Sequence, residues 1–408
     1  MTGRPGLHSA RNNLRQLVNS LKRLIIGHDD MINGLLLALV AGENVVIIGP
    51  PGIAKTFLVK NLAKRLGANY YMYLLGKFTD FSELFGPIDV LKLAREGKLV
   101  RSWSRIVDAD IVFLDEIFKA NTAILNSLLA FLQERIVYDP LTGEEKQVKL
   151  WTLIGASNEV PEDEELKALY DRFPIRIFEN YLNNAVLIKR ALSSRWSSMN
   201  ASRDAARASM DDIRRLHDFS NNLLSSGIST LPLPFHRIYS EIVIPAIDYL
   251  KEKMEHKDES SEFSISDRTL IEKLPKLYAA SLALRGVTPE NIAFYSVKDA
   301  LKYLGDNAEQ QKELRFHIDV YMQEERQIID VVRDSISKLR AGRIEAAAKT
   351  LESLKDRCNK DRGRFSVEIL CTYVNSMHEH IINLSSDAKR AIIVEEVRKK
   401  WMSVVNQQ

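Results

Sequence analysis

The stretch Asn44-Val-Val-Ile-Ile48-Gly49-Pro-Pro-Gly52-Ile-Ala-Lys55-Thr56 decides the fold. A short β-branched run that stops at Gly-Pro-Pro-Gly predicts a buried parallel strand entering a tight loop, and residues 57–66 predict the helix that follows. Such a loop points several unpaired backbone N–H groups at one spot beside the positive end of the helix, and that spot suits phosphate. Lys55 would reach the terminal phosphates, and Thr56 would take one position on a magnesium ion.

The loop matches the phosphate-binding pattern G-x-x-x-x-G-K-[ST] except at Ala54, which stands where the pattern has glycine. Alanine is the smallest residue with a Cβ atom, so we expect the loop to accept it provided that its φ is negative. The competing interpretation is an ordinary Gly/Pro turn followed by a surface lysine. If the nucleotide site is real, its binding residues form one run: Gly49, Pro50, Pro51, Gly52, Ile53, Ala54, Lys55, Thr56 and Phe57.

Length and composition indicate an ordinary soluble protein of two or three domains. The chain has 408 residues, 45% apolar and 27% charged, and its net charge of +3 gives no support by itself to a polyanion-binding role. From its two cysteines, Cys358 and Cys371, we expect no disulfide framework and a reducing compartment. The longest apolar stretch, Leu35–Ala41, is far too short to span a bilayer. We therefore expect a cytoplasmic protein without direct membrane insertion, which a partner could still attach to a membrane.

A second chemical element is Ile111-Val-Phe-Leu114 followed by Asp115 and Glu116. Four consecutive apolar residues predict a strand buried on both faces, so both carboxylates emerge at its carboxyl end, where open α/β sheets bind ligands. We expect Asp115 to hold the magnesium ion and Glu116 to polarise the water that attacks the γ-phosphate. An Asp-Glu pair after a strand is otherwise only a helix cap, but its place downstream of the Gly-Pro loop favours the catalytic interpretation.

Two more polar residues extend this candidate site. Residues 150–154 predict another central strand, so Asn158 lands on the same sheet edge, where its amide would orient the attacking water. Arg172 closes a short predicted helix. It either interacts with the C-terminal dipole of that helix or, as an arginine finger, completes the active site of a neighbouring subunit. The sequence supports these two interpretations about equally. Arg176 is a second candidate for the finger.

The segment ahead of the first strand bears on base binding. Two predicted helices, over residues 1–24 and 29–40, leave a cleft in which a base could lie. His28 would stand at the edge of this cleft. The interpretation that we favour is a turn histidine without a ligand role.

Residues 88–105 form a broken stretch that is too irregular for one helix. One interpretation is a grip on nucleic acid or on an extended peptide, and the other is a solvated hairpin. The residues behind the first interpretation are Arg95, Lys98, Arg101, Trp103 and Arg105.

The phosphate loop, the strand that ends in Asp115 and Glu116, the strand that leads to Asn158, and Arg172 follow one another along the chain. In the order and spacing of these features, the chain resembles the AAA+ ATPases. Within them, Gly49-Pro-Pro-Gly-Ile-Ala-Lys-Thr56, Phe113-Leu-Asp-Glu-Ile-Phe-Lys-Ala-Asn121 and Leu125-Asn-Ser-Leu-Leu-Ala-Phe-Leu-Gln-Glu-Arg135 look like the MoxR group, close to its RavA branch. The alanine at position 54 fits that group. The resemblance is specific over residues 24–178. It implies a pore-facing insertion within residues 88–105, and it assigns Walker A to Gly49–Thr56, Walker B to Asp115 and Glu116, sensor 1 to Asn158 and an arginine finger to Arg172.

The remainder of the chain predicts helices. Residues 180–305 fit the all-α lid of an AAA+ module, with Ser266 capping a helix that begins at Asp267. In the resemblance, Arg268 corresponds to sensor 2 and would contact the γ-phosphate of the nucleotide, whereas local pairing with Asp267 is the alternative. Beyond residue 306 the helices are long and charged, with a heptad-like seam that Glu325 interrupts and a last helix predicted over residues 389–405.

We therefore expect an α/β fold with three parts. An AAA+ core over residues 1–179, with a central parallel sheet flanked by helices, precedes an all-α lid over residues 180–305 and a C-terminal helical extension over residues 306–408. The catalytic residues of this core would be Lys55, Glu116, Asn158 and Arg172.

The resemblance also implies a function. The chain would form a homohexameric ring that binds ATP and Mg2+, hydrolyses ATP to ADP and phosphate, and remodels a protein client as a chaperone-like machine. MoxR relatives act on proteins with a von Willebrand factor A domain, which this chain lacks, so a separate partner with that domain is implied. Two classes compete: a motor on nucleic acid, which salt-sensitive binding to DNA or RNA would favour, and a scaffold that assembles on ATP with little turnover.

Overall fold

The structure, a computed structural model, describes residues 4–197, 208–225, 237, 239–255, 265–360 and 365–382. The predicted helix over residues 389–405 lies outside these ranges. The chain divides into two compact units, the first made of Met1–Asp218, Ser266–Lys273 and Asp306–Ala308, the second of the remaining residues. The division into three domains stays a prediction.

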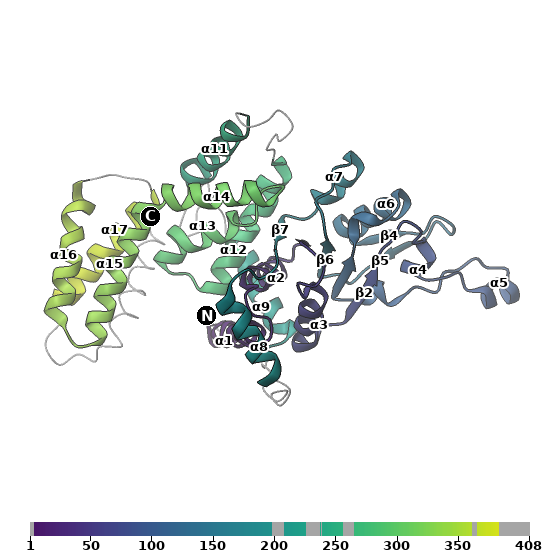
Figure 1. The fold of residues 1–408 in the computed structure, drawn as a ribbon, viewed down its shortest axis with the longest axis horizontal. Helices are drawn as coiled ribbons and strands as arrows, with labels where there is room; N and C mark the ends of the chain where they lie inside the picture. The colour runs from purple at the N-terminus through teal and green to yellow at the C-terminus, as the bar shows by residue number, and fades with distance from the viewer. Residues whose placement is uncertain are drawn as a thin grey trace. The chain divides into compact units, whose positions relative to one another are not determined.

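The first unit is built on a five-stranded parallel sheet with the order β2-β3-β6-β1-β7 (Figure 1). In this register Ile48 lies beside Ser157, and Leu74 beside Asp115, so the carboxyl ends of the strands meet at one edge. The strands are β1 (Val45–Ile48), β2 (Tyr70–Leu74), β3 (Ile111–Asp115), β6 (Thr152–Ser157) and β7 (Ile175–Phe178).

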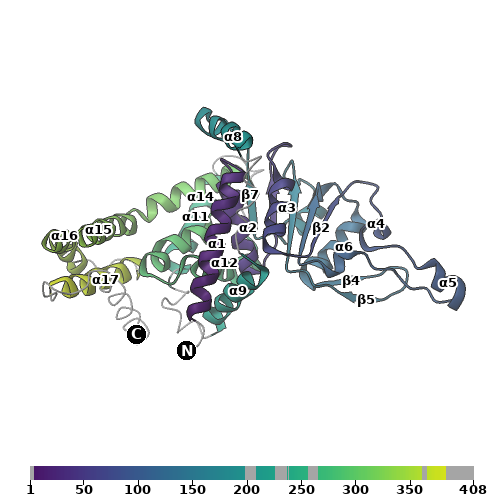
Figure 2. The same ribbon diagram turned by 90° about the horizontal axis from the view of Figure 1, so that it is seen from below.

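Helices cover both faces of the sheet. One face is packed by α4 (Phe81–Phe85), α6 (Thr122–Gln133) and α7 (Glu164–Tyr170), and its core includes the fully buried side chains of Leu128 and Phe131. Burial of a side chain of this size contributes about 1.5–3 kcal/mol. The other face carries α2 (Asp29–Ala41) and α3 (Lys55–Leu66), with α1 (Arg4–Leu24) packed against them (Figure 2). The predicted α/β class, with a parallel sheet flanked by helices, is confirmed.

Two segments of the first unit leave the sheet. Between α4 and β3, Ile88 pairs with Arg101 in an antiparallel bridge, and α5 (Val90–Glu96) projects beyond that bridge (Figures 1 and 2). The strands β4 (Ile136–Tyr138) and β5 (Glu145–Gln147) form the hairpin that the turn residues predict. The remaining elements here are the 3-10 turns η1 (Arg105–Asp108) and η2 (Ile117–Lys119), helix α8 (Ala185–Ser197) and the π-helix η5 (Thr269–Lys273).

The second unit is helical over its described residues. Helix α9 (Met210–Ser225) begins in the first unit and ends in the second. No helix of the described ranges is long and apolar enough to cross a membrane. The others are η4 (Tyr239–Val243), α11 (Ile244–Glu255), α12 (Leu274–Arg285), η6 (Asn291–Tyr295), α13 (Ser296–Leu301), α14 (Ala308–Tyr321), α15 (Gln323–Arg340), α16 (Ile344–Lys360) and α17 (Phe365–Ile382).

The heptad-like seam of the second unit is buried but broken. Leu314 and Ile318 are buried on α14, and Ile328 on α15, while Met322 separates the two helices. Glu325 is fully buried within this seam, where its Oε1 accepts a hydrogen bond from Ser366 Oγ at 2.6 Å. This hydrogen bond from a hydroxyl of α17 offsets part of the cost of burying the carboxylate inside the bundle.

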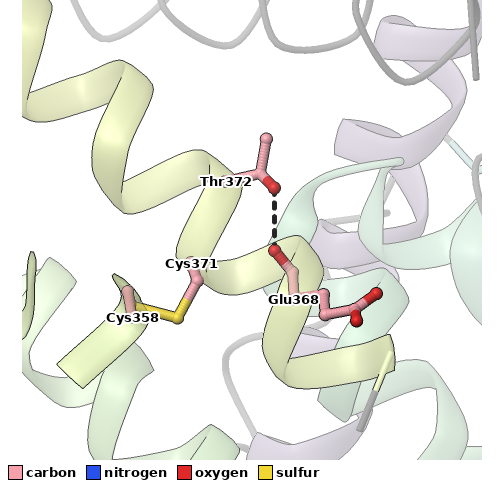
Figure 3. The surroundings of a disulfide bond; sticks show 4 residues. All are labelled: Cys358, Glu368, Cys371 and Thr372. Atoms are coloured by element: carbon pink, nitrogen blue, oxygen red, sulfur yellow. Dashed lines mark hydrogen bonds between the residues drawn. A yellow bond between two sulfur atoms is a disulfide. The ribbon is translucent and has the colours of Figure 1, made fainter. Parts of the chain in front are cut away.

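The two cysteines are joined, so the expectation of no disulfide was wrong. Cys358 of α16 and Cys371 of α17 form a disulfide across the two helices (Figure 3). Their Cα atoms lie 5.3 Å apart, within the usual range for such a bond. The two cysteines are 13 residues apart in the sequence, and their pairing depends on α16 and α17 packing against each other.

Candidate functional site

The loop over residues 49–54 joins β1 to α3 at the carboxyl edge of the sheet. Gly49 N–H donates to Ser157 O at 3.1 Å, which ties the loop to β6. A Cβ atom at Gly49 would lie 2.4 Å from the backbone oxygen of Glu179, so only glycine fits there. Gly52 has a φ of +87°, which glycine adopts without strain. Both glycines of the motif are therefore explained by local geometry.

Ala54 corrects one expectation about this loop. Its φ is +65° and its ψ 25°, so the residue is in the left-handed region instead of the negative-φ region that we expected. That conformation costs an L-residue with a Cβ atom roughly 1–2 kcal/mol. Its backbone oxygen nevertheless accepts the first hydrogen bond of α3, from Leu58 N–H at 2.9 Å. The loop thus holds a strained residue at the start of the helix, as ligand-binding loops often do.

Lys55 folds back over the loop. Its ammonium donates to Gly49 O at 2.5 Å, to Ser157 O at 3.0 Å and to Asn158 Oδ1 at 3.2 Å. Only 7% of the residue is exposed. Burial lowers the pKa of Lys55 below its ordinary value, and the nearby carboxylates of Asp115 and Glu116 oppose that shift. Lys55 is therefore a buried cation held in front of the loop by oxygen atoms that a phosphate could replace.

Thr56 and Asp115 form an oxygen pair at the same edge. Thr56 Oγ1 donates to Asp115 Oδ2 at 3.4 Å, although the two residues come from α3 and β3. Asp115 Oδ1 accepts from Glu116 N–H at 3.1 Å, which fixes the orientation of the carboxylate. A hydroxyl and a carboxylate are ligands that suit Mg2+, which takes one or two protein oxygens and completes its shell with phosphates and water. The residues present fit that ion.

Glu116 and Asn158 are in direct contact. Asn158 Nδ2 donates to Glu116 Oε1 at 2.8 Å, and Asn158 Oδ1 accepts from Lys55, so the amide bridges the cation and the carboxylate. Glu116 has a φ of +53°, a left-handed conformation at the turn after β3. The structure thus brings Lys55, Thr56, Asp115, Glu116 and Asn158 together, although their individual roles stay predictions.

Lys119 belongs to this site and was missed from the sequence. Its ammonium lies 3.2 Å from Glu116 Oε2, three residues along the chain in the turn η2. The signal was present, because a residue three positions after another lies beside it in a helical turn. In the sequence, however, nothing distinguishes Lys119 from other charged residues at that spacing.

A cavity of about 220 Å³ adjoins the loop. It lies between the turn that joins α1 to α2 and the start of α3, where the sequence predicts a cleft for a base. His28 is at its wall, and its Nδ1 lies 3.0 Å from Glu179 Oε2, and whether it has a ligand role stays a prediction. Tyr181 and Leu182 could not be found from the sequence, since nothing marks them before the fold is known. The lining residues are Leu24, Ile25, Ile26, His28, Gly52, Ile53, Ala54, Phe57, Tyr181 and Leu182.

Arg172 and Arg268 lie together at a corner of the first unit. Arg172 Nη1 is paired with Asp171 Oδ2 at 3.1 Å, and Asp171 Oδ1 accepts from Ser266 Oγ at 2.8 Å. Burial lowers the pKa of Arg172, and the positive charge of Arg268 lowers it further.

Arg268 makes its contacts at this corner. Its Nη1 donates to Gln133 Oε1 at 3.4 Å, and its Nε lies 3.7 Å from the Glu272 carboxylate. The acidic partner in this structure is thus Glu272, one helical turn away, and not Asp267, which the alternative interpretation named. The predicted contact of Arg268 with a γ-phosphate stays a prediction.

Arg176, the second candidate for an arginine finger, is occupied within its own unit. It forms an ion pair with Asp306, and its guanidinium lies 4.2 Å from the ring centroid of Tyr170. The Tyr170 hydroxyl in turn donates to Asp306 O at 2.8 Å. Both arginines are thus paired with an aspartate of their own unit, and which of the two serves as an arginine finger stays a prediction.

Arg101 corrects the interpretation of residues 88–105. Only 3% of the residue is exposed, and it makes a bidentate ion pair with Asp139 of the β4–β5 turn, with Nε–Oδ2 and Nη2–Oδ1 distances of 2.7 and 2.9 Å. It also donates to Gly86 O. Arg101 is therefore unavailable to grip nucleic acid. It fixes the base of the α5 segment to the hairpin, whereas α5 itself has no buried residue.

Comparison with known proteins places this geometry in a family. Residues 12–218, just over half of the chain, match the family described as the MoxR domain in the MoxR–vWA–β-propeller ternary systems. Two uncharacterized proteins of Methanocaldococcus jannaschii are each 40% identical over 165 residues, which are 40% of this chain and 43% of theirs. The chaperone MoxR1 of Mycobacterium tuberculosis is 27% identical over 139 residues, which are 33% of this chain and 35% of that protein. The chain thus spans less than half the length of these curated relatives.

A solved structure shares the fold. The crystal structure of a Cytophaga hutchinsonii protein described as a "putative ATPase" superposes with a TM-score of 0.55 and 18% identity, covering 78% of this chain and 96% of that one. At this identity the likeness concerns the fold alone. The parallel sheet with its loop 49–54, the match over residues 12–218 and the chaperone relative agree, and the chain belongs to the MoxR family of AAA+ ATPases.

Proposed function

We propose that the chain binds ATP and hydrolyses it to ADP and phosphate, as a ring-forming, chaperone-like machine that acts on a partner protein. The observation that carries the proposal is the convergence of Lys55, Thr56, Asp115, Glu116 and Asn158 at the carboxyl edge of one sheet. These side chains come from three separate elements and the loops after them, so sequence proximity does not explain their meeting. The MoxR family and the chaperone relative support the same function.

The chain's own groups suggest how ATP binds. The phosphates approach the loop 49–54 and the N-terminus of α3, where free N–H groups and the helix dipole favour negative charge. Lys55 then exchanges Gly49 O and Ser157 O for phosphate oxygens, a stronger charge-assisted interaction. The base enters the neighbouring cavity, whose walls are mostly apolar.

The positions of Glu116 and Asn158 support a route for hydrolysis. Once Lys55 has turned to the phosphates, the Asn158 oxygen is free to orient a water molecule beside Glu116. The water oxygen bonds to the γ-phosphorus and gives a proton to the Glu116 carboxylate. The bond from that phosphorus to the bridging oxygen breaks, its electron pair stays on ADP, and the proton later passes to solvent.

Thr56 and Asp115 would hold Mg2+ with the phosphates. The ion would supply charge neutralisation on the β- and γ-phosphates. The hydroxyl and the carboxylate already lie together at 3.4 Å before any ligand is considered.

We further propose that the active site is shared between subunits of a homohexamer. Arg172 and Arg268 place two guanidinium groups at one corner, where Asp171 and Glu272 offset part of their charge, and their mutual repulsion would favour a further anion there. A γ-phosphate held by the adjacent subunit would be that anion, so Arg172 would act as an arginine finger and Arg268 as a second contact across the interface.

The partner protein is proposed to carry a von Willebrand factor A domain. The family description, which names MoxR, vWA and β-propeller proteins, supports this class of partner. The exposed α5 segment, with Val90, Leu91 and Leu93 uncovered, is the surface we propose for contact with the client in the central pore. Placement in the RavA branch and a cytoplasmic location stay predictions.

A first experiment tests the active site. We would measure ATP turnover, binding of a non-hydrolysable ATP analogue and particle mass for the wild type and Glu116→Gln. The amide keeps the shape of the side chain but cannot take a proton, so turnover should fall by about 10²–10⁴-fold while analogue binding and assembly persist. Equal turnover in the two proteins would remove Glu116 from the mechanism.

A second experiment tests the shared site by mixing subunits. Arg172→Ala and Glu116→Gln proteins should each be inactive alone. In a mixed ring, an intact Glu116 of one subunit meets an intact Arg172 of its neighbour, so the mixture should regain activity. The control replaces the Arg172→Ala protein with one that carries both substitutions, and that mixture should stay inactive. If both mixtures are equally inactive although rings form, the site is not shared.

A further inference from the structure

The segment over residues 266–273 is fastened to the first unit at both of its ends. At one end, Ser266 Oγ donates to Asp171 Oδ1 at 2.8 Å. At the other end, the ammonium of Lys273 lies 3.1 and 2.8 Å from the two carboxylate oxygens of Glu43. The segment belongs to the first unit, although the chain directly before it and directly after it is part of the second.

Arg268 lies between these two anchors. Burial lowers the pKa of Arg172, and the charge of Arg268 lowers it further, so the two side chains are neighbours. We propose that Lys273 and Glu43 are positioning residues that hold Arg268 beside Arg172, where the two arginines would meet the nucleotide of a neighbouring subunit. This inference rests on the proposed function of that corner, and it concerns what keeps Arg268 there.

The ion pair between Lys273 and Glu43 is nearly withdrawn from water. The two side chains are 15% and 5% exposed, whereas those of the surface pair Lys22–Asp29 are 31% and 57% exposed. A surface pair contributes little, because water and salt screen it. Removing the ammonium of Lys273 would instead leave a buried carboxylate without this counter-charge, which is costly. The pair is therefore able to fix the end of the segment.

The backbone of the segment allows both ends to face the first unit. In an α-helix, residues five apart point in directions about 140° apart. Residues Thr269–Lys273 instead form the π-turn η5, whose hydrogen bonds join residues five apart and thereby bring positions 268 and 273 toward one face. The π-turn ends at Lys273, the last residue of the segment that belongs to the first unit.

The start of β1 holds both of the segments that carry these arginines. Glu43 and Asn44 directly precede this strand. Glu43 accepts the ammonium of Lys273, and Asn44 Nδ2 donates to the backbone oxygen of Arg172 at 3.5 Å. Two consecutive residues thus fasten the backbone at Arg172 and the segment of Arg268, which opposes the mutual repulsion of the two guanidinium groups.

The test compares Lys273→Met with two matched variants. Methionine keeps much of the length of lysine and removes its charge, whereas Lys273→Arg keeps the charge. Lys22→Met makes the first change at the exposed pair with Asp29, in the same unit. For each protein we would measure kcat for ATP, the affinity for a non-hydrolysable ATP analogue and the hydrogen exchange of residues 266–273.

We expect Lys273→Met to speed the hydrogen exchange of residues 266–273 by about tenfold or more, because one anchor of the segment is lost. Its kcat should fall by roughly 10- to 100-fold, since a small misplacement of a group that contacts the reacting phosphate is enough for such a loss. Analogue affinity should change little, because the loop 49–54 holds the nucleotide. Lys273→Arg and Lys22→Met should match the wild type.

Unchanged exchange or unchanged kcat in Lys273→Met would overturn the inference, as would equal effects in Lys22→Met. Glu43→Gln provides a second route to the same test if Lys273→Met does not fold. The amide keeps the shape of the side chain and removes its charge, so exchange and kcat should change in the same directions as in Lys273→Met. A Glu43→Gln protein that matches the wild type in both measurements would equally contradict the inference.

A double variant separates this inference from the proposed function. If Lys273 acts through Arg268, Arg268→Ala combined with Lys273→Met should be no slower than Arg268→Ala alone. A further loss in the double variant would show that Lys273 acts elsewhere, and the inference would fail. If Arg268→Ala alone hydrolyses ATP like the wild type, the proposed role of the corner fails, and the hydrogen exchange of Lys273→Met still decides whether the anchor exists.

Discussion

Asn158 donates its side-chain amide to the Glu116 carboxylate at 2.8 Å, across the gap between two neighbouring parallel strands. We predict that Asn158→Ala lowers kcat for ATP by roughly 10²-fold with little change in KM, because the amide orients the water without binding the substrate tightly. Steady-state kinetics checks this. Asn61→Ala is the control, since that exposed amide donates only to Phe57 O of its own helix. Equal losses in both variants would contradict the role of Asn158.

Ala54 should be replaceable with a gain in stability. Glycine adopts a φ of +65° without the roughly 1–2 kcal/mol penalty of an L-residue, and part of that gain is offset by the greater freedom of the unfolded chain. We expect Ala54→Gly to stabilise the first unit by up to about 1 kcal/mol. Ala54→Val, which adds a β-branch at the same φ, should destabilise it. Thermal unfolding of both variants checks the sign, and a lower midpoint for the glycine variant would show that the left-handed conformation carries no strain.

The Arg101–Asp139 pair should be important for stability. Arg101→Ala leaves a buried carboxylate without its partner, and we expect a loss of about 3–5 kcal/mol in the free energy of unfolding. Urea denaturation measures it. Arg95→Ala, on the exposed α5, should change stability by no more than about 0.5 kcal/mol. A small loss in the Arg101 variant would mean that water replaces the pair.

The Arg101–Asp139 pair should also make the free energy of unfolding depend on pH in the acidic range. Burial alone would raise the pKa of Asp139, but the Arg101 guanidinium and the Leu141 N–H together lower it to about 2, from an ordinary value of 3.8. Because the folded-state pKa is the lower one, the stabilisation is complete above about pH 3.8 and is lost as the pH falls from there toward 2. Unfolding measured from about pH 5 down to about pH 2 should show this loss in the wild type and not in an Asp139→Asn variant.

The disulfide should stabilise the second unit without affecting ATP turnover. A disulfide that closes a loop across a separation of 13 residues lowers the entropy of the unfolded chain, which raises the free energy of unfolding by about 3 kcal/mol. Reductant should therefore lower the unfolding midpoint of the second unit, while a variant with both Cys358→Ala and Cys371→Ala should not respond to reductant. Differential scanning calorimetry with and without reductant measures both. A wild-type midpoint that does not change after full reduction would show that the helices alone hold the unit.

Much of the core was predictable because its signals are local. The run Ile111–Leu114 is apolar at every position, which predicts a buried strand, and it forms most of β3. The turn residues Asp139–Gly143 predict the hairpin of β4 and β5. In a parallel sheet the carboxyl ends of the strands lie at one edge, so the sequence alone predicts that Asp115 and Asn158 lie near each other. The fold class and the family were accessible for the same reason.

The features that escaped prediction depend on contacts between distant parts of the chain. Arg101 looked like a surface cation, and only the position of Asp139 on the neighbouring hairpin makes it a buried one. The sign of φ at Ala54 follows from how the loop meets α3, which composition does not encode. The pairing of Cys358 with Cys371 likewise needs α16 and α17 to pack against each other.

Helix α5 contributes no side chain to the core, and the bridge at Ile88 and Arg101 closes behind it. The packing of the core therefore does not constrain the side chains of α5. Under the proposed function, substitutions in α5 would therefore change which partner protein the chain contacts and leave the sheet and the residues at its carboxyl edge as they are.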